Sequence, residues 1–579
     1  MDPRPRGKDC IEQPSCLNRQ IRPCPSGLPS FRFPVPRGAC KHSCVTFNAC
    51  ASYIARMKPG AKSVRSVVFA LLASLFLAAP ILAAEATSPG TRKDASWAFF
   101  NDPAVRTFQI EISPAGLSLL QRSQRTYVKG TVREGDQVFT NVGIRLKGMG
   151  SFRPLYEKPS LAVKFDEFVE AQEYSSLTKL MFNNSVQDHT YMVEALGTQL
   201  FRDAELPAAR VTHARVVLNG RDLGLYVVIE AMNKRFLKQH FTSSKGNLYE
   251  AYLQDIDGRL EQDNGEPGDQ SDLRALVAAC RVREPNERFK QMSKVLDIDR
   301  FVSFTAMEIL MGHWDGYATH TNNYRIYHDP TSDKMVFITH GLDWAFRRPN
   351  ISITPPLKAI VGRALFQTAE GDRMFRERIG TLYTNVFRVS VITNRMDQLM
   401  AKIRTAGLSA RELAKVEGAA AIMRERIALR SVRIADQLAG KELPIAKFGA
   451  DGTAHPTGWR PEYDRGEPTM DQPIFEGRRT LHFRANNERT HGSWRTQLYL
   501  PRGRYRIEGL VRTEAFNGAT TLRISGGDRD YSASSSSSWR KISYDFEIPE
   551  GLDVEFVCDF SASSGDVWYD LDAFRVRKF

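Results

Sequence analysis

Two aspartates and a pair of asparagines surround a predicted hairpin in residues 312–346. Asp315 precedes the run YRIYH, Asn322 and Asn323 stand directly before it, and Asp343 follows the run MVFIT. Both runs are rich in β-branched and aromatic residues, and the DPTSDK between them is typical of a turn. Folding this hairpin brings the flanking loops to the same end, where a carboxylate could act as a base and side-chain oxygens could hold Mg²⁺. Loop aspartates also serve as turn or cap residues, and this group alone does not decide between the two roles.

A glycine-bearing loop and a strand lysine come earlier in the chain. The run RLKGMGSF ends a predicted strand with Lys147, Gly148 and Ser151, and the next strand, SLAVKFDEF, carries Lys164. Backbone N–H groups of such a loop can contact phosphate oxygens, and a strand lysine can add a cation. Short glycine loops are most often tight turns and strand lysines most often face solvent, so a structural alternative stays open.

The elements between these two regions follow from local signals. The run TKLMFNNSVQDHTYMVEALG predicts a strand, a loop and a helix that Asp188 can cap. Glu194 falls off the apolar stripe of that helix, where it either pairs with Lys164 or is solvated. A hairpin turning at Asn219–Gly220 ends at Glu230, and a helical segment follows.

The second half of the chain divides into three regions that differ in residue composition and pattern. Helical patterning dominates from 272 to 440, apart from the hairpin, and ends at Gly440. A stretch rich in Gly, Pro and charge, 444–469, predicts a linker. Residues 470–579 contain short strands with turns every 8–12 residues or so, which is typical of a β-sandwich. The predicted fold class is α+β, with an all-β sandwich at the C-terminus.

The N-terminal region predicts export. Lys58, Lys62 and Arg65 precede an apolar run that closes with small residues near Ala84 and Ala86, which indicates a secretory signal peptide over 57–86. A membrane anchor is the alternative, since the run is close to the roughly 18–20 residues that span a bilayer. We expect residues 1–56 to be an over-extended start ahead of Met57. A disulfide-rich or zinc-binding module is the other interpretation of its six cysteines, although their spacing lacks a C-x-x-C pair.

The net charge and the two cysteines outside residues 1–56 limit the kinds of partner and cross-link that we expect. Residues 1–56 carry nine basic and three acidic residues, so the rest of the chain has a net charge of +8 rather than +14. This mild excess does not favour a nucleic-acid partner. Cys280 and Cys558 are far apart in sequence, and we expect no disulfide between them. After signal cleavage we expect a protein of the periplasm, cell envelope or medium, with no integral membrane segment.

The order of these pieces resembles the CotH kinase family over roughly residues 105–440. The motifs that carry the resemblance are RLKGMGSF, KPSLAVKF, KLMFNNSVQDHTYMVEALG, VVLNGRDLGLYVVIEAM, GNLYEAY, NNYRIYHD and GLDWAF. The resemblance implies an atypical, two-lobed kinase-like domain over 105–443, after a leader at 87–104. It also implies transfer of the ATP γ-phosphate to Ser or Thr of secreted, coat or envelope proteins.

The resemblance also implies site roles. Asp315 would be the catalytic base, and Asp343 with Asn323 would be the Mg²⁺ ligands. Lys164 would contact the phosphates and pair with Glu194, and Glu230 would lie near the adenine. The loop with Lys147, Gly148 and Ser151 would cover the phosphates.

Two departures from the family pattern raise the alternative of an inactive member. The loop reads KGMGS where the family has a sequence like RGNSS, and THGLD lacks a second aspartate two residues before Asp343. An inactive member would be a structural or adhesive envelope protein. A second alternative is another ATP-using transferase that transfers AMP or ligates an amino acid, because such a core fixes the geometry of ATP but not the acceptor.

The end of the chain, VWYDLDAFRVRKF, is similar to the last strand of galactose-binding-like jelly rolls, which implies a polysaccharide ligand. Trp494, Trp539 and Trp568 could stack on sugars, although sandwich aromatics are more often core. Asp570 and Asp572 could hold a structural Ca²⁺.

Overall fold

In the computed structural model, seven strands close into a barrel in the order β1-β2-β3-β4-β5-β7-β6. The barrel closes because β1 pairs with β6 in parallel, whereas its other strand pairs are antiparallel. Its interior is filled by Phe108, Ile144, Phe182 and other buried apolar side chains. The strands are β1 (Arg106–Ile112), β2 (Val128–Glu134), β3 (Gln137–Lys147), β4 (Ser160–Lys164), β5 (Lys179–Asn183), β6 (Val211–Leu218) and β7 (Arg221–Glu230).

The structure describes residues 95–486, 490–528, 536–549 and 551–579, all within one compact unit. The predictions for residues 1–56 and for the signal peptide at 57–86 lie outside the described residues. Part of the predicted leader is helical, since α2 (Ala95–Asn101) inserts Phe99 and Phe100 into the barrel core. Within the described ranges, no helix is both long and apolar enough to cross a membrane.

Short helices connect the barrel strands to one another and to the next sheet. Ser113 caps α3 (Pro114–Arg122) by accepting a hydrogen bond from the Gly116 N–H. The predicted turn at Asn219–Gly220 is confirmed, because both residues have positive φ, as a type I′ turn requires. The other two helices of this region are α4 (Val193–Asp203) and α5 (Lys234–His240).

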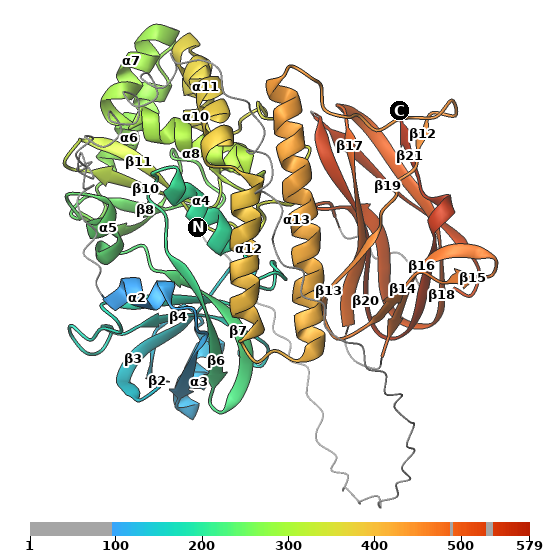
Figure 1. The fold of residues 1–579 in the computed structure, drawn as a ribbon, viewed down its shortest axis with the longest axis horizontal. Coiled ribbons are helices and arrows are strands. Elements are labelled where there is room, and N and C mark those ends of the chain that lie inside the picture. Colours follow the sequence, from blue (N-terminus) through green and yellow to red (C-terminus); the bar gives the residue numbers. More distant parts are fainter. Residues whose placement is uncertain (1–94, 487–489, 529–535, 550) are drawn as a thin grey trace, which may run out of the picture. The chain divides into compact units, whose positions relative to one another are not determined.

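The predicted hairpin over 324–339 is confirmed and belongs to a four-stranded sheet in the order β11-β10-β8-β9. Its strands are β8 (Leu248–Glu250), β9 (Glu261–Asn264), β10 (Tyr324–Asp329) and β11 (Lys334–Thr339). The predicted helical half is also observed, and Figure 1 shows α12 and α13 running side by side. Its helices are α6 (Ser271–Cys280), α7 (Pro285–Val295), α8 (Ile298–Leu310), α9 (Tyr317–His320), α10 (Ile360–Phe366), α11 (Ala369–Asn385), α12 (Val389–Arg404) and α13 (Ala410–Leu438).

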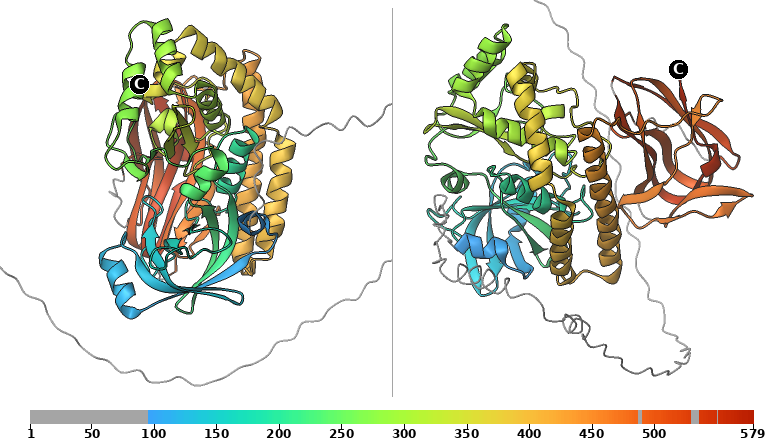
Figure 2. Two further views of the ribbon diagram at one scale, coloured as in Figure 1. Left: turned by 90° about the vertical axis from the view of Figure 1, so that its left-hand side faces the viewer. Right: turned by 45° about the horizontal axis from the view of Figure 1, so that its top comes forward.

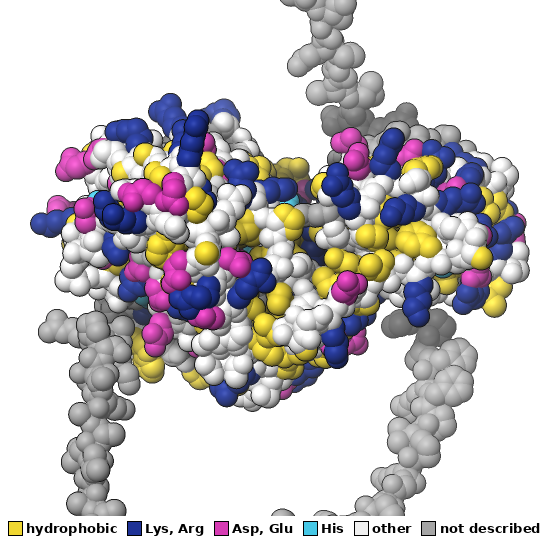
Figure 3. Space-filling model, turned by 90° about the horizontal axis from the view of Figure 1, so that it is seen from above, with side chains coloured by type: hydrophobic (Ala, Val, Ile, Leu, Met, Phe, Trp, Pro, Cys, Tyr) yellow, Lys and Arg dark blue, Asp and Glu magenta, His cyan; other side chains and the backbone are white. Residues whose placement is uncertain are grey.

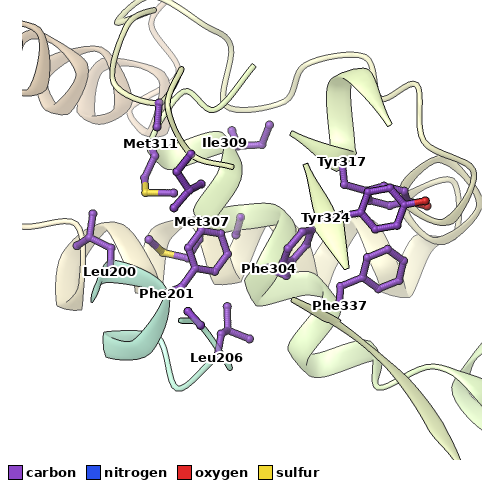
Figure 4. Packing of buried hydrophobic residues seen from close by; sticks show 14 of the residues in the cluster. Leu200, Phe201, Leu206, Phe304, Met307, Ile309, Met311, Tyr317, Tyr324 and Phe337 are labelled. Carbon is purple, nitrogen blue, oxygen red and sulfur yellow. The ribbon is translucent and has the colours of Figure 1, made fainter. Parts of the chain in front are cut away.

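One hydrophobic cluster joins α4, α8 and the hairpin (Figure 4). The rings of Phe201 on α4 and Phe304 on α8 have centroids 5.7 Å apart. On the other side of α8, the ring centroid of Phe337 on β11 lies 4.7 Å from that of Tyr317 and 5.7 Å from that of Tyr324. This packing fixes the loop that carries Asp315 relative to the hairpin and to α4.

The C-terminal β-region, residues 453–578, is built from strands around a single core cluster. Its two longest strands, of 22 and 19 residues, are longer than the short strands that the sequence predicted. A register shift between Glu514 and Gly518 lets β18 bend without leaving the sheet. The strands are β12 (Thr453–Ala454), β13 (Arg460–Arg465), β14 (Thr469–Asp471), β15 (Ile474–Phe475), β16 (Arg478–Ala485), β17 (Thr490–Leu500), β18 (Gly503–Ile524), β19 (Arg540–Ile548), β20 (Leu552–Asp570) and β21 (Arg575–Lys578), with a 3₁₀ turn at Leu571–Ala573.

The predicted linker at 444–469 is wrong in part, because β12 and β13 lie within it. Strand β13 pairs with β17 and also contacts α13. The Tyr463 ring lies 3.7 Å from Lys415 Nζ, and Arg460 is 3.0 Å from Glu425. Figure 2 shows α13 standing beside this β-region.

Candidate functional site

A cavity of about 590 Å³ opens where the ends of β3, β4, β5 and β7 face β9 and β10. Seven of its lining residues are lysine or arginine and three are acidic, so the cavity favours an anionic ligand. This differs from the outer face in Figure 3, where basic and acidic side chains are interspersed. The lining basic residues are Lys147, Lys164, Lys179, Lys234, Arg235, Lys238 and Arg325.

Lys147, the last residue of β3, is the lysine that connects this cavity with buried carboxylates. Its ammonium group donates to Asn183 Oδ1 and lies in the electrostatic field of Asp343 and Glu194. Burial lowers the pKa of Lys147 to about 8, and the two carboxylates oppose this shift. The side chain is therefore a partly desolvated cation, which suits contact with a phosphate.

The predicted pair between Lys164 and Glu194 is wrong. Lys164 Nζ is 2.6 Å from Glu167 Oε2, within its own turn. The register of the β3–β4 pair explains the error, because Lys147 lies opposite Ser160 and Lys164 lies opposite Gly143. Four residues of strand, roughly 13 Å, separate these positions, so Lys164 and Lys147 cannot both face Glu194.

Glu194 is buried, which also excludes the solvated alternative. The residue is 4% exposed, and its Oε2 accepts a hydrogen bond of 2.9 Å from the Leu342 N–H. Gly197, one turn later on α4, permits this approach, since a Cβ there would lie 2.6 Å from Leu342 Cδ1. Glu194 thus anchors the residue directly before Asp343.

Asp343 lies in a crowded acidic environment. Burial raises its pKa above the ordinary value, the neighbouring Asp188 adds to this shift, and Lys147 opposes it. Burial also raises the pKa of Glu194 to about 8, with Asp343 contributing. Asp188 itself accepts from the Thr190 and Val193 N–H groups, so its predicted capping role is confirmed. Asp343 therefore lies near two further carboxylates, Glu194 and Asp188, and this local excess of negative charge is one that a cation would relieve.

Asp315 and Asn323 are brought into direct contact. The Asn323 side-chain amide donates to the Asp315 carboxylate at 3.0 Å and to its backbone carbonyl at 2.9 Å. The Asn323 Oδ1 lies against the backbone of Gly341, whose φ of +59° lets the chain pass at this distance. Asn322 donates to the other Asp315 oxygen at 3.3 Å. The hairpin therefore places Asp315, Asn323 and the loop of Asp343 at one end, as the sequence predicted.

A buried glutamate holds the Asp315 loop, and the sequence analysis missed it. Glu308 accepts hydrogen bonds of 2.9 Å from the N–H groups of Tyr317 and Ala318, at the start of α9. Burial raises the pKa of Glu308 to about 8 and lowers that of the adjacent His313 to about 4. A glutamate within the apolar run of α8 was the available signal, because such a residue needs buried partners.

Glu230 and Lys147 line the cavity, whereas Gly148 and Ser151 of the predicted phosphate loop are not among its lining residues. Glu230 lines the cavity, but its carboxylate is bound by Arg210 at 2.6 Å, so any contact with a ligand would come from other atoms of this segment. Gly148 has φ of +93°, and a Cβ there would lie 2.8 Å from Ser151 Oγ. The Ser151 carbonyl accepts from Asn184, which ties the loop to the segment that carries Asp188.

The donor set fits a hard divalent cation with few protein ligands. The described residues contain no group of three or more His, Cys, Asp or Glu arranged to hold a metal ion. Mg²⁺ is commonly held by one or two carboxylates together with substrate phosphates. Asp343, with its raised pKa, and the Asn323 Oδ1 would supply such oxygen ligands beside the basic cavity.

The C-terminal aromatic predictions are corrected in two of three cases. Trp494 and Trp568 are 2% and 6% exposed, so they belong to the packed interior. Trp539 is partly exposed, and its Nε1 donates to Glu476 at 2.8 Å. Asp570 and Asp572 pair with Arg478 and Arg479, and the predicted Ca²⁺ site stays a prediction. The cysteine prediction is confirmed, because Cys280 and Cys558 are both free and buried.

Residues 144–416 match the family described as CotH kinase protein. The chain is also 23% identical, over 181 residues, to spore coat protein homolog 1 of Rhizopus delemar. That alignment covers 28% of this chain and 29% of the relative, so the chain spans under a third of the length of the curated protein it matches.

Two solved structures align with parts of this chain. The proinflammatory kinase CtkA of Helicobacter pylori aligns over 48% of this chain and 94% of its own, with 11% identity and a TM-score of 0.26. The CBM22-1 xylan-binding domain of Paenibacillus barcinonensis Xyn10C aligns over 21% and 85%, with 17% identity and a TM-score of 0.15. Neither score is high enough to define the fold of this chain.

Proposed function

From the match of residues 144–416 to the CotH kinase family, we propose that this protein is an exported, Mg²⁺-dependent kinase. It transfers the γ-phosphoryl group of ATP to Ser or Thr hydroxyls of secreted, coat or envelope proteins. The proposal includes a two-lobed kinase-like domain over 105–443, with the barrel as one lobe and the helical half as the other. It also includes a jelly-roll sandwich that binds polysaccharide at the C-terminus.

The observation that carries the proposal is the position of Lys147. This residue lines the basic cavity and at the same time faces Asp343 and Glu194. A volume of about 590 Å³ lies within the range of roughly 300–1,000 Å³ that small-molecule sites occupy. A polyphosphate in the cavity would thus meet a desolvated cation beside the Asp343 carboxylate, which would hold the metal.

The remaining roles follow from the contacts of each residue. Asp343 and Asn323 would hold Mg²⁺, which when bound neutralises charge on the phosphates. Asp315 would orient the acceptor hydroxyl, because Asn322 and Asn323 fix both of its carboxylate oxygens. Glu194 would hold the Asp343 loop through the Leu342 N–H.

The proposed reaction is an in-line displacement at the γ-phosphorus. The acceptor oxygen forms the new P–O bond as the bond to the β,γ-bridging oxygen breaks, and ADP leaves. The hydroxyl proton passes to the Asp315 carboxylate. Burial raises the pKa of Asp315, which makes this carboxylate a better proton acceptor than one in water.

A transfer assay tests the proposal. We would incubate the purified protein with γ-labelled ATP, Mg²⁺ and candidate coat or envelope proteins, and measure the mass of the modified acceptor. The expected result is a gain of one phosphate that Asp315→Asn abolishes and Asp333→Asn leaves unchanged. Asp333 is a suitable control because it is an exposed aspartate in the turn of the same hairpin.

Two outcomes would contradict the proposal. A mass gain of a nucleotide would show an AMP transferase on the same core. No ATP binding or transfer, with an intact fold, would show a structural or adhesive protein. The missing second acidic residue before Asp343 makes this distinction worth measuring.

A further inference from the structure

Residues 344–351, the segment that follows Asp343, have no regular helix or strand. The Phe346 N–H donates to the Met311 carbonyl, and Phe346 is buried with a positive φ of 60°. Arg347 lies over the Trp344 ring at 4.2 Å and Arg348 over the Trp314 ring at 4.0 Å. A segment with a strained backbone and stacked arginines needs external contacts to keep one conformation.

Helix α13 supplies one set of these contacts. Arg426, Arg430 and Arg433 recur at spacings of four and three, so they share one face of the helix. Arg430 is 2% exposed and donates to the carbonyls of Ile309, Leu310, Pro349 and Ile351. Arg433 Nε donates to Asn350 Oδ1 at 2.9 Å.

The C-terminal β-region supplies the second set. Asp553 of β20 accepts hydrogen bonds from the Asn350 N–H at 2.7 Å and from its side-chain amide at 2.9 Å. Asp553 is 1% exposed, so these are hydrogen bonds to a buried carboxylate. Gln497 of β17 donates to the Arg347 carbonyl at 3.3 Å. Asn350 therefore bridges α13 and β20.

Charge complementarity extends this interface to the site. Asp553 and Glu555 alternate by two along β20, so both side chains lie on one face. Both carboxylates, together with Asp315, lie close enough to Arg348 to favour its charged form despite its burial. Glu462 of β13 likewise interacts electrostatically with Arg347, Arg426 and His189.

We propose that the C-terminal β-region positions the nucleotide site: Asp553 holds residues 344–351 through Asn350 and thereby fixes Arg348 and the loop of Asp343. The β-region is then a part of the kinase site and not an independent accessory module. Asp553 and Asn350 act as positioning residues through Arg348 and the backbone, whereas the Glu555 carboxylate is paired with Arg495. The expected effect on ATP binding rests on the proposed function. The fixing of residues 344–351 by the β-region does not depend on it.

The test compares Asp553→Ala with Asp545→Ala. Asp545 is a matched control, since it pairs with Arg506 at an exposed position of the same β-region. Limited digestion with trypsin, followed by mass spectrometry, measures cleavage between Arg347 and Arg348. We expect about tenfold faster cleavage at this bond in Asp553→Ala, because losing two hydrogen bonds to a buried carboxylate favours local opening by at least that factor.

Binding of ATP with Mg²⁺ is measured on the same proteins by calorimetry. We expect Kd to rise about three- to tenfold in Asp553→Ala and to stay at the wild-type value in Asp545→Ala. If Asp553→Ala fails to fold, Asp553→Asn keeps the side-chain size and one acceptor, and we expect an intermediate rise in cleavage.

Equal cleavage in the Asp553 and Asp545 variants would overturn the inference, whatever the ATP affinity. Faster cleavage with an unchanged Kd would also overturn it, since the segment would then not position the site. A wild-type protein that binds no ATP would refute the proposed function, and the cleavage comparison alone would then decide whether the β-region holds the segment.

Discussion

Replacing Lys147 by Met tests which lysine serves the phosphates. Lys147 is partly desolvated, with a pKa lowered to about 8, so at pH 7 its charged form exceeds its neutral form roughly ten to one. A hydrogen bond from a charged donor contributes about 1.5–3 kcal/mol. Losing it on a phosphate oxygen should weaken ATP binding by about 10- to 150-fold.

Lys164→Met is the matched control for this prediction. Lys164 is also a strand-end lysine and lines the same cavity, but its ammonium group pairs with Glu167 and its side chain is 34% exposed. Partly exposed ion pairs contribute at most about 1 kcal/mol, so this variant should weaken binding by less than about fivefold.

Calorimetry of both variants with ATP and Mg²⁺ at pH 7 measures the difference. Circular dichroism confirms that each variant remains folded. A larger loss of affinity in Lys164→Met than in Lys147→Met would refute the assignment of Lys147 as the phosphate contact. It would also refute the inference, from the β3–β4 register, that Lys147 and not Lys164 faces Glu194.

Three further predictions concern stability and ligand binding. Arg430→Met removes a donor that four backbone carbonyls share, of which the Ile309 carbonyl keeps the Gly312 N–H, and it should lower the free energy of unfolding in urea by at least about 3 kcal/mol. Arg424→Met on the same helix should lower it by under about 1 kcal/mol, and similar losses would contradict the role given to Arg430. The raised pKa of Glu194, about 8, means that the folded state binds more protons than the unfolded state between about pH 4.5 and 8, so the melting temperature should fall as pH rises through this window. Glu194→Gln should flatten that slope, and an unchanged slope would assign it to another group. Trp494→Ala should destabilise the β-region by about 3–5 kcal/mol, because this side chain is buried. Trp539→Ala should change stability by less than about 1 kcal/mol and should weaken retention of the protein on polysaccharide columns. Retention equal to that of the wild type would exclude Trp539 as a sugar contact.

Local signals in the sequence predicted the parts of the site that depend on local structure. The hairpin over 324–339, the Asn219–Gly220 turn and the Asp188 cap are confirmed, because each depends on residues within one turn or strand pair. The meeting of Asp315 and Asn323 follows from that hairpin. Local sequence rules therefore located the segments that carry Asp188, Asp315 and Asn323.

The remaining features depend on contacts that the sequence does not encode locally. Which lysine faces Glu194 depends on the register of β3 against β4, and the connection between these strands, residues 148–159, is too long to be a hairpin turn that would fix this register. The burial of Glu194 depends on Leu342 packing onto α4 at Gly197, 145 residues apart in the chain. Strand β18 is longer than the predicted short strands because the turn-like residues near Gly518 form a bulge within one strand. The contact between Asn350 and Asp553 had no sequence signal at all.

Under the proposed function, Asp343 and Lys147 form a metal-dependent nucleotide site. The most direct test is the thermal shift produced by ATP, with and without Mg²⁺, in the wild type, Asp343→Asn and Asp333→Asn. We expect a Mg²⁺-dependent rise in melting temperature that Asp343→Asn loses and Asp333→Asn keeps. No Mg²⁺-dependent rise in the wild type, or an equal rise in Asp343→Asn, would contradict it.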